Sequence, residues 1–275
     1  EKSRDDLSNY RNIAIFGIDN RNQEEYTTYE AGNNRTDCII IASINKNTNE
    51  VKLVSVYRDT FVDINGKGLE NINEAYSIGG EQLAVANFVD SIGGIELDIT
   101  KEELKYINGY IKGVKENTGL SASNITKAGR QNINGVQAVA YSRIRYDGGD
   151  HKRTERMRTV LTKSFEKLKS KSITELNSIA DKMLPEIYTN IRTNEIFSMI
   201  PEVIKYNIGK TEGWPYKIID KSVQNRWHGF PCSLETNVEQ LHKSLFPDIE
   251  YEVSDTVKNI SNQIKEVSGY DENSI

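Results

Sequence analysis

The eight residues Asn12-Ile-Ala-Ile-Phe-Gly-Ile-Asp19 form a short apolar run that ends in a glycine and an aspartate. Their number and their residue types predict a buried β-strand. Two further apolar runs, residues 38–45 and 51–57, flank Lys46-Asn-Thr-Asn49, which predicts a hairpin between two more strands. The first part of the chain therefore predicts strands of one sheet.

Helices and further strands are predicted along the rest of the chain. Apolar residues three and four apart favour helices near residues 134–141, 150–169, 173–187, 193–205, 236–245 and 254–267. A helix is also expected to begin at residues 71–75, and strands at 94–99 and 214–219. Strands that alternate with helices are typical of α/β proteins, and no repeat or linker divides the chain. We therefore expect a single domain over residues 1–275, an α-β-α sandwich with a central mixed sheet.

Composition excludes several classes of protein. The 275 residues carry a net charge of −5, whereas proteins that bind nucleic acid normally have a basic surface, so we expect no nucleic-acid partner. No run of about eighteen apolar residues is present, so no residue range predicts a membrane-spanning helix. Two cysteines are too few for a disulfide scaffold.

Five arginines crowd the segment Tyr141-Ser-Arg-Ile-Arg-Tyr-Asp-Gly-Gly-Asp-His-Lys-Arg-Thr-Glu-Arg-Met-Arg158. Arg153 and Arg156 are three residues apart, which places them on one face of a helix that Asp150 could open as N-cap. A bend at the two glycines would direct several guanidinium groups at one place. Such groups suit a phosphate or diphosphate, because each can donate two parallel hydrogen bonds and stays charged. The alternative interpretation is a solvated basic face of a surface helix.

Three other pieces carry candidate site residues: Gly17-Ile-Asp19-Asn-Arg21, Arg35-Thr-Asp37 and Tyr57-Arg58-Asp59. Asp19 and Asp37 flank the same long polar loop, so folding could bring their carboxylates together. Paired carboxylates beside arginines suit a Mg²⁺–diphosphate site, because the cation takes carboxylate and phosphate oxygens while arginines neutralise the remaining charge. Taken singly, Asp19 is better explained as a turn residue after a strand, and Asp37 as an ion pair to Arg35; the order of the pieces along the chain favours the site.

In their order along the chain these pieces resemble the LytR–CpsA–Psr family of cell-envelope phosphotransferases, over residues 12–162. The resemblance rests on Ile-Phe-Gly-Ile-Asp19, Arg35-Thr-Asp37, Ser55-Val-Tyr-Arg58-Asp59-Thr, Ile72-Asn-Glu-Ala-Tyr76-Ser-Ile-Gly-Gly80, Ile92-Gly-Gly-Ile95, Asn134-Gly-Val-Gln-Ala-Val-Ala-Tyr141-Ser-Arg-Ile-Arg145 and Gly149-Asp150-His-Lys-Arg153-Thr-Glu-Arg156. It implies an α/β fold that encloses an apolar tunnel for a prenyl chain. The candidate lining of the tunnel is the inward faces of residues 13–16, 39–41 and 53–56, with Leu161, Phe165 and Leu168 from the helix after the arginines. One departure is Met157, where family members commonly have glutamine.

The resemblance also implies a function and a set of site residues. The protein would transfer a glycopolymer phosphate from a polyprenyl-diphosphate carrier to peptidoglycan in Gram-positive cell-wall assembly. It would act outside the cytoplasm, held at the outer face of the cytoplasmic membrane by an anchor upstream of Glu1. Asp19 and Asp37 would hold Mg²⁺, or Mn²⁺. The arginines that would grip the diphosphate are Arg21, Arg58, Arg143, Arg145, Arg153 and Arg156. Of these, Arg58, Arg143, Arg145 and Arg153 would act in catalysis, with Asp150 orienting arginines at the bend.

Two questions stay open from the residues. The same site would serve a hydrolase of the diphosphate bond, or a non-catalytic binder or regulator, although such a binder would not need the aspartate pair. The stretch near Ala84 and Val85 is also shorter than the family pattern, which has a further strand there. Either this chain lacks the strand or the numbering omits a segment. We favour the omission, because deleting a core strand would leave backbone groups unpaired.

Overall fold

The computed structural model describes residues 7–19, 35–64, 68–74, 81–146, 149–187, 189–223 and 225–275. The chain divides into two compact units, one of Glu1–Gly79 with Ile208–Ile275 and the other of Gly80–Asn207. Each unit has its own cluster of buried apolar side chains. The single domain expected from the sequence stays a prediction.

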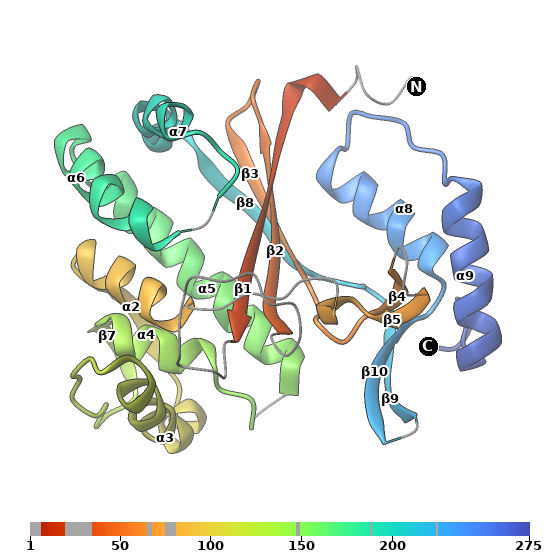
Figure 1. The fold of residues 1–275 in the computed structure, drawn as a ribbon, viewed down its shortest axis with the longest axis horizontal. Coiled ribbons are helices and arrows are strands. Elements are labelled where there is room, and N and C mark those ends of the chain that lie inside the picture. The colour runs from red at the N-terminus through yellow and green to blue at the C-terminus, as the bar shows by residue number, and fades with distance from the viewer. Residues whose placement is uncertain are drawn as a thin grey trace. The chain divides into compact units, whose positions relative to one another are not determined.

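The first unit contains a central sheet of four strands (Figure 1). Their order is β1 (Tyr10–Asp19), β2 (Arg35–Asn45), β3 (Glu50–Val56) and β8 (Asn207–Trp214). The first three are antiparallel neighbours, and the turn at residues 46–49 joins β2 to β3 as predicted. Strand β3 is buried along most of its length because it has neighbours on both sides. Strand β1 has one described neighbour, and its Ile15 and Phe16 are exposed.

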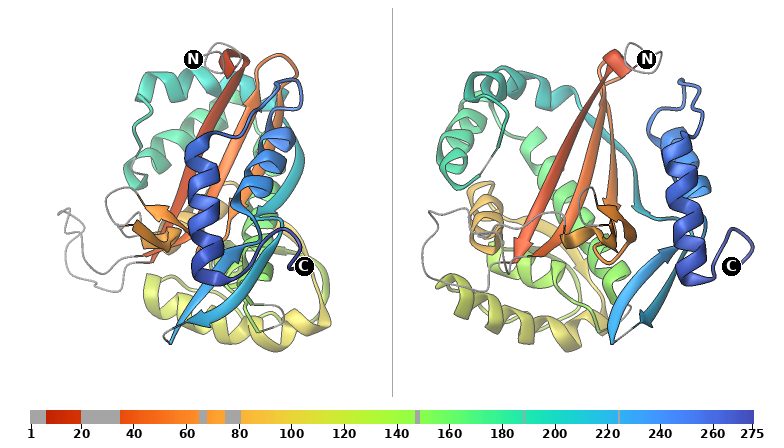
Figure 2. Two further views of the ribbon diagram at one scale, coloured as in Figure 1. Left: turned by 90° about the vertical axis from the view of Figure 1, so that its right-hand side faces the viewer. Right: turned by 45° about the vertical axis from the view of Figure 1, so that its right-hand side comes forward.

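Short hairpins and two helices complete the first unit. Strands β4 (Phe61–Ile64) and β5 (Gly68–Asn71) pair with each other, as do β9 (Ile218–Val223) and β10 (Arg226–Pro231). Helices α8 (Leu234–Leu245) and α9 (Asp255–Ser268) lie side by side (Figure 2). The 3-10 turns are η1 (Leu7–Asn9) and η2 (Ile72–Glu74).

Two predicted elements of this unit are wrong. The helix expected at residues 71–75 is the end of β5 followed by the single turn η2. The strand expected at 214–219 falls across a break, because β8 ends at Trp214 and β9 begins at Ile218. Pro215 has no N–H to donate to a ladder, so a continuous strand through it is disfavoured.

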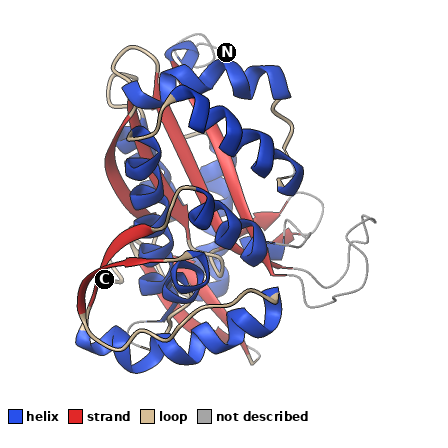
Figure 3. Ribbon diagram, turned by 90° about the vertical axis from the view of Figure 1, so that its left-hand side faces the viewer, coloured by secondary structure: helices blue, strands red, loops and turns tan. Residues whose placement is uncertain are grey.

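The second unit is mainly helical, as the colouring of Figure 3 shows. It begins with α2 (Glu81–Ser91), β6 (Ile95–Ile99), α3 (Lys101–Thr118), β7 (Gly129–Ile133) and α4 (Gly135–Ser142). It continues with α5 (Gly149–Lys169), α6 (Ile173–Met183), η3 (Leu184–Glu186), α7 (Thr193–Met199) and η4 (Ile200–Lys205). Strands β6 and β7 are antiparallel. The core lies between this pair and the helices, with side chains such as Ile99, Ile107 and Val136 at most 1% exposed.

Helix α2 runs across Ala84 and Val85 without a break. The omitted segment expected at this position stays a prediction. None of the described helices is both long enough and apolar enough to cross a bilayer.

Candidate functional site

The first two arginines of the arginine-rich segment, Arg143 and Arg145, follow directly after helix α4. Asn134 caps the helix through a reciprocal pair of hydrogen bonds with Gln137, the side chain of each accepting from the backbone N–H of the other. A side chain at Gly135 would collide with the backbone of Ala86, so α4 packs closely against α2. All its residues up to Tyr141 are buried. The segment that follows therefore emerges from a fixed helix.

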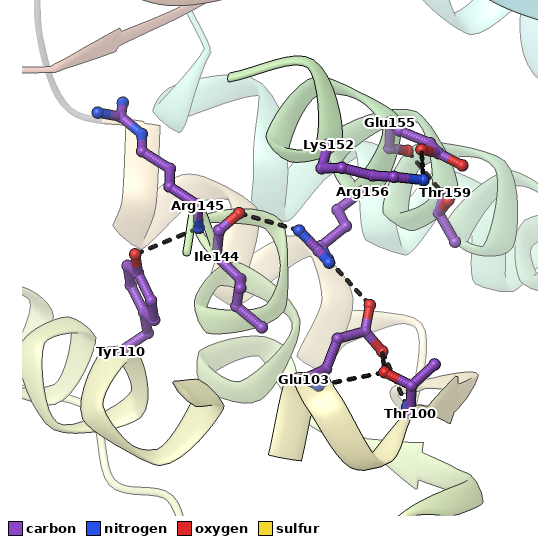
Figure 4. Close-up of polar contacts among 9 residues, drawn as sticks. All are labelled: Thr100, Glu103, Tyr110, Ile144, Arg145, Lys152, Glu155, Arg156 and Thr159. Atoms are coloured by element: carbon purple, nitrogen blue, oxygen red, sulfur yellow. Dashed lines mark hydrogen bonds and ion pairs between the residues drawn. The ribbon is translucent and has the colours of Figure 1, made fainter. Parts of the chain in front are cut away.

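The segment Arg143-Ile144-Arg145 forms a short bend whose backbone is held on several sides. The N–H of Arg143 donates to the carbonyl of Ala140 at 3.2 Å, and the side chain of Ile144 is fully buried. The backbone N–H of Arg145 donates to the hydroxyl of Tyr110 at 3.3 Å. Its carbonyl accepts from the N–H of Gly149 at 2.8 Å. In Figure 4 the side chain of Arg145 extends away from Tyr110.

Arg156, on α5, is a buried support of this bend. Its Nη1 donates to the carbonyl oxygen of Ile144 at 3.0 Å, and its Nε donates to Oε1 of Glu103 at 2.9 Å (Figure 4). The Arg156 and Glu103 side chains are 6% and 8% exposed. The guanidinium carbon also lies 5.8 Å from the centre of the Tyr141 ring. A charge buried to this degree requires such partners, so these contacts explain the position of Arg156 without a ligand.

Glu103 has two structural tasks at once. Its Oε2 accepts from the N–H and the hydroxyl of Thr100, at 2.9 and 3.0 Å, which closes a capping box at the start of α3. Its other oxygen, Oε1, binds Arg156. Burial and the nearby Glu103 carboxylate raise the pKa of Tyr141 to about 12. The Tyr141 phenol, beside the Arg156–Glu103 pair, is therefore protonated and uncharged at neutral pH.

Asp150 and Arg153 pair within the first turns of α5. Oδ1 of Asp150 lies 2.8 Å from Nη2 of Arg153, and the side chain of Arg153 is only 2% exposed. Asp150 was expected as the N-cap, but α5 begins at Gly149, so Asp150 is in the first helical turn. A carboxylate there is favoured by the helix dipole. The contact holds the side chain of Arg153, one of the three arginines on this helix.

The first unit carries the other candidates. Nε of Arg58 lies 3.4 Å from Oδ2 of Asp59, and both side chains are about one fifth exposed, at 23% and 21%. The register of β1 and β2 pairs Gly17 with Cys38 and Ile18 with Thr36, so Asp37 is the extra residue of a bulge. Asp19, paired with Arg35, is next along the same end of this ladder. The backbones of the two aspartates are thus close together.

The sequence model of the LytR_cpsA_psr family matches residues 2–88 and 84–228. The chain belongs to this family. The two parts of the match overlap at residues 84–88, within α2, where the sequence is shorter than the family pattern. The match extends well beyond residue 162, where the resemblance noted from the sequence ended.

Curated relatives agree with the family assignment. The Enterococcus faecalis protein named polyisoprenyl-teichoic acid–peptidoglycan teichoic acid transferase TagU is 31% identical over 216 residues, which cover 74% of this chain and 68% of the relative. The Bacillus subtilis protein of the same name is 28% identical over 194 residues, which cover 67% of this chain and 60% of the relative. The chain therefore spans about two thirds of these relatives' length or less.

Solved structures confirm the fold. A protein of Enterococcus faecalis described as a transcriptional regulator (EF0465) matches with a TM-score of 0.69 at 17% identity, over 98% of each chain. The LytR-CPS2A-psr family protein YwtF (TagT) with bound octaprenyl pyrophosphate lipid gives a TM-score of 0.57 at 15% identity, over 88% of this chain and 91% of that one. The α/β class with a central sheet, predicted from the sequence, is confirmed.

Three of the candidate site residues lie wholly or partly outside the described part of the chain. Arg21 lies outside the described residues, and so do the side chains of Asp19 and Asp37. Among the side chains that are described, no group of three or more histidine, cysteine, aspartate or glutamate residues is placed to hold a metal ion. The convergence of Arg58, Arg143 and the other arginines with the aspartate pair stays a prediction.

The residues proposed to line a prenyl tunnel have different environments. Ile39, Leu53 and Val54 are core residues of the first unit, at most 6% exposed. Ile15 and Phe16 of β1 are 39% and 43% exposed. Leu161, Phe165 and Leu168 are half-buried on α5. The tunnel that the family resemblance implies stays a prediction.

Two residues that support the bend were missed from the sequence, and both lie on α3. The hydroxyl of Tyr110 accepts from the backbone N–H of Arg145, 35 residues away. Glu103 binds Arg156, which in turn donates to the carbonyl of Ile144. A signal for one of them was present, because Thr100-Lys-Glu-Glu103 has the spacing of a capping box. That pattern predicts the start of a helix, but it gives no indication that Glu103 also binds Arg156.

Proposed function

We propose that this protein transfers a glycopolymer phosphate from a polyprenyl diphosphate to peptidoglycan. The observation that carries the proposal is the arginine bend, in which Arg143 and Arg145 flank the buried Ile144 on a backbone held by Arg156 and Tyr110. Guanidinium groups carried on a fixed backbone suit an anion with several oxygens. Relatives named as teichoic acid transferases acting between a polyisoprenyl carrier and peptidoglycan support it.

The proposed reaction is a phosphoryl transfer. A hydroxyl oxygen of the peptidoglycan forms a bond to the phosphorus that carries the glycopolymer, the bridging P–O bond of the diphosphate breaks, and polyprenyl phosphate leaves. The acceptor hydroxyl releases its proton to solvent, and the phosphate that leaves takes the electron pair of the broken P–O bond. Arg143 and Arg145 would stabilise charge on the diphosphate oxygens, and their fixed backbone reduces the reorganisation needed during reaction.

Mg²⁺, or Mn²⁺, is the cofactor that we propose. Asp19 and Asp37 would hold it. The backbone register of the β1–β2 ladder supports this proposal, because both residues lie at the same end of that ladder. Two carboxylates with phosphate oxygens are a donor set that Mg²⁺ prefers. The cation would neutralise part of the diphosphate charge.

The proposal includes a place of action. Since the named relatives act on peptidoglycan, we propose that this protein also acts outside the cytoplasm, held at the outer face of the cytoplasmic membrane by an anchor upstream of Glu1. Proteolysis of intact cells from outside would test it. Loss of the protein from intact cells supports this location, and full protection until lysis contradicts it.

Product analysis tests the reaction itself. The purified protein is incubated with a lipid-diphosphate-linked oligosaccharide, Mg²⁺, and peptidoglycan fragments, and a parallel sample omits the fragments. A transferase gives a phosphodiester-linked adduct and prenyl phosphate only with the acceptor. Equal release of prenyl phosphate in both samples would identify a hydrolase, and binding without any product would identify a non-catalytic binder.

A further inference from the structure

Three tyrosines of the second unit form a cluster beside Arg145. Tyr106 and Tyr110 lie four residues apart on α3, so they share a face of that helix. The ring of Tyr146 stacks on Tyr106, with ring centres 5.2 Å apart and 23° between the planes. It is tilted relative to Tyr110, with centres 6.2 Å apart at 57°. The cluster thus supports one side of the Tyr146 ring.

The rest of the Tyr146 side chain is open. Its exposed fraction is 75%, the highest among the exposed large apolar and aromatic residues of the described chain. A tyrosine has few rotatable bonds, so binding a ligand costs little side-chain entropy. Single exposed aromatic residues are common on protein surfaces and need no function. Tyr146 differs because its ring is stacked and because of its place in the chain.

That place is next to the arginine bend. Tyr146 directly follows Arg145, whose backbone N–H is held by the hydroxyl of Tyr110. Successive Cα atoms are about 3.8 Å apart, so the ring begins one residue from the guanidinium proposed to bind the diphosphate. In the proposed donor the first sugar is bonded to the diphosphate through a single oxygen. That sugar must lie beside the groups that hold the diphosphate.

We propose that Tyr146, supported by Tyr106 and Tyr110, binds the pyranose ring linked to the diphosphate of the donor. This inference rests on the proposed function and names a specificity residue for it. One face of a pyranose presents C–H groups and packs on an aromatic ring, while the phenol hydroxyl can bond to the sugar's hydroxyls. Tyr146 would then select donors by the sugar next to the phosphate and orient that phosphate toward the acceptor.

Two ligands that differ by one sugar test the assignment. We would measure binding of farnesyl diphosphate and of farnesyl diphosphate linked to one N-acetylglucosamine, with Mg²⁺, to the full chain. The variants are Tyr146→Ala, which removes the ring, and Tyr146→Phe and Tyr146→Trp, which keep a ring. Trp227→Ala is the matched control, because Trp227 is 58% exposed on β10 of the other unit.

Tyr146→Ala should weaken binding of the sugar-bearing ligand about tenfold and leave farnesyl diphosphate unchanged. Phe and Trp should keep most of the sugar-dependent affinity, and Trp227→Ala should change neither ligand. Equal weakening of both ligands, or none, would overturn the role of Tyr146 while the proposed function stands. Failure of the wild-type protein to bind either lipid diphosphate would overturn the proposed function, and this inference with it.

Discussion

Nε of Arg156 donates to Oε1 of Glu103 at 2.9 Å, and both side chains are more than nine-tenths buried. The sequence interpretation placed Arg156 among the diphosphate ligands. That role stays a prediction. In the structure its Nη1 donates to the carbonyl of Ile144, between Arg143 and Arg145. Arg156 is best described as a positioning residue, because it acts on the bend through the backbone of Ile144.

Replacing Glu103 should therefore destabilise the protein strongly. Glu103→Gln leaves the buried guanidinium of Arg156 without its counter-charge, and removing one partner of such a pair costs roughly 3–5 kcal/mol. Glu175→Gln is a matched control, because Glu175 closes the same kind of capping box with Ser172 but is exposed. It should cost about 1 kcal/mol or less. The free energy of unfolding in urea measures both, and equal costs would contradict the buried role.

Arg145→Ala should weaken ligand binding and leave the stability of the protein almost unchanged. The Arg145 side chain is exposed, so its removal should change the free energy of unfolding by less than about 0.5 kcal/mol. Binding of a prenyl diphosphate should fall roughly tenfold to a hundredfold, since hydrogen bonds to charged groups contribute about 1.5–3 kcal/mol. Arg192→Ala, at an exposed arginine before α7, should change neither quantity. Unchanged affinity in Arg145→Ala would remove this arginine from the site.

Chelation should abolish turnover if Asp19 and Asp37 hold a divalent cation. EDTA should stop the reaction, and Mg²⁺ or Mn²⁺ should restore it. Asp37→Asn should need a much higher Mg²⁺ concentration for half-maximal rate. Titration of the rate against Mg²⁺ measures this shift, with Asp63→Asn, at an exposed residue of β4, as the control. An Asp37→Asn protein with the wild-type Mg²⁺ dependence would return this carboxylate to a structural role.

The phenol of Tyr141 should make stability fall in alkali. Burial, followed by the charge of Glu103, raises its pKa from 10.0 to about 12. The unfolded phenol ionises near pH 10 while the folded one stays protonated. The stabilisation is therefore complete below pH 10 and is lost as pH rises through about 12. Between about pH 9 and about pH 11.5, the free energy of unfolding in urea should fall less for Tyr141→Phe than for the wild type, because phenylalanine has no phenol to ionise. Parallel pH curves would contradict this assignment.

The parts of the fold that follow from local pattern were predictable from the sequence. The apolar runs at residues 12–19 and 38–45 lie within β1 and β2, and the run at 51–57 overlaps β3 except for its last residue. Strand β8 was missed because Asn207-Ile-Gly-Lys-Thr-Glu-Gly-Trp214 is mostly polar and largely exposed, so it has little apolar signal. Strand β10 was missed as well, although its pairing with β9 is regular.

The candidate site was predictable only in part, for a different reason. The arginine-rich segment and the aspartates are visible in the sequence, but arginine is normally an exposed residue. The burial of Arg153 and Arg156 therefore had no local signal. The burial of Arg153 depends on Asp150, on the same helix, and the burial of Arg156 depends on Glu103, 53 residues away. Only the packing of α3 beside α4 and α5 supplies that partner.

The position of β8 beside β3 has a consequence for biosynthesis. Everything from residue 57 to residue 206, including all the helices of the second unit, lies between these two neighbouring strands. During synthesis the β1–β2–β3 meander can form early, because these strands are made first. The other edge of β3 stays unpaired until β8 has been made. During that interval β3 presents unpaired backbone groups, which can pair with another nascent chain. Slower elongation between residues 57 and 206 should therefore increase aggregation more than the same delay after Trp214.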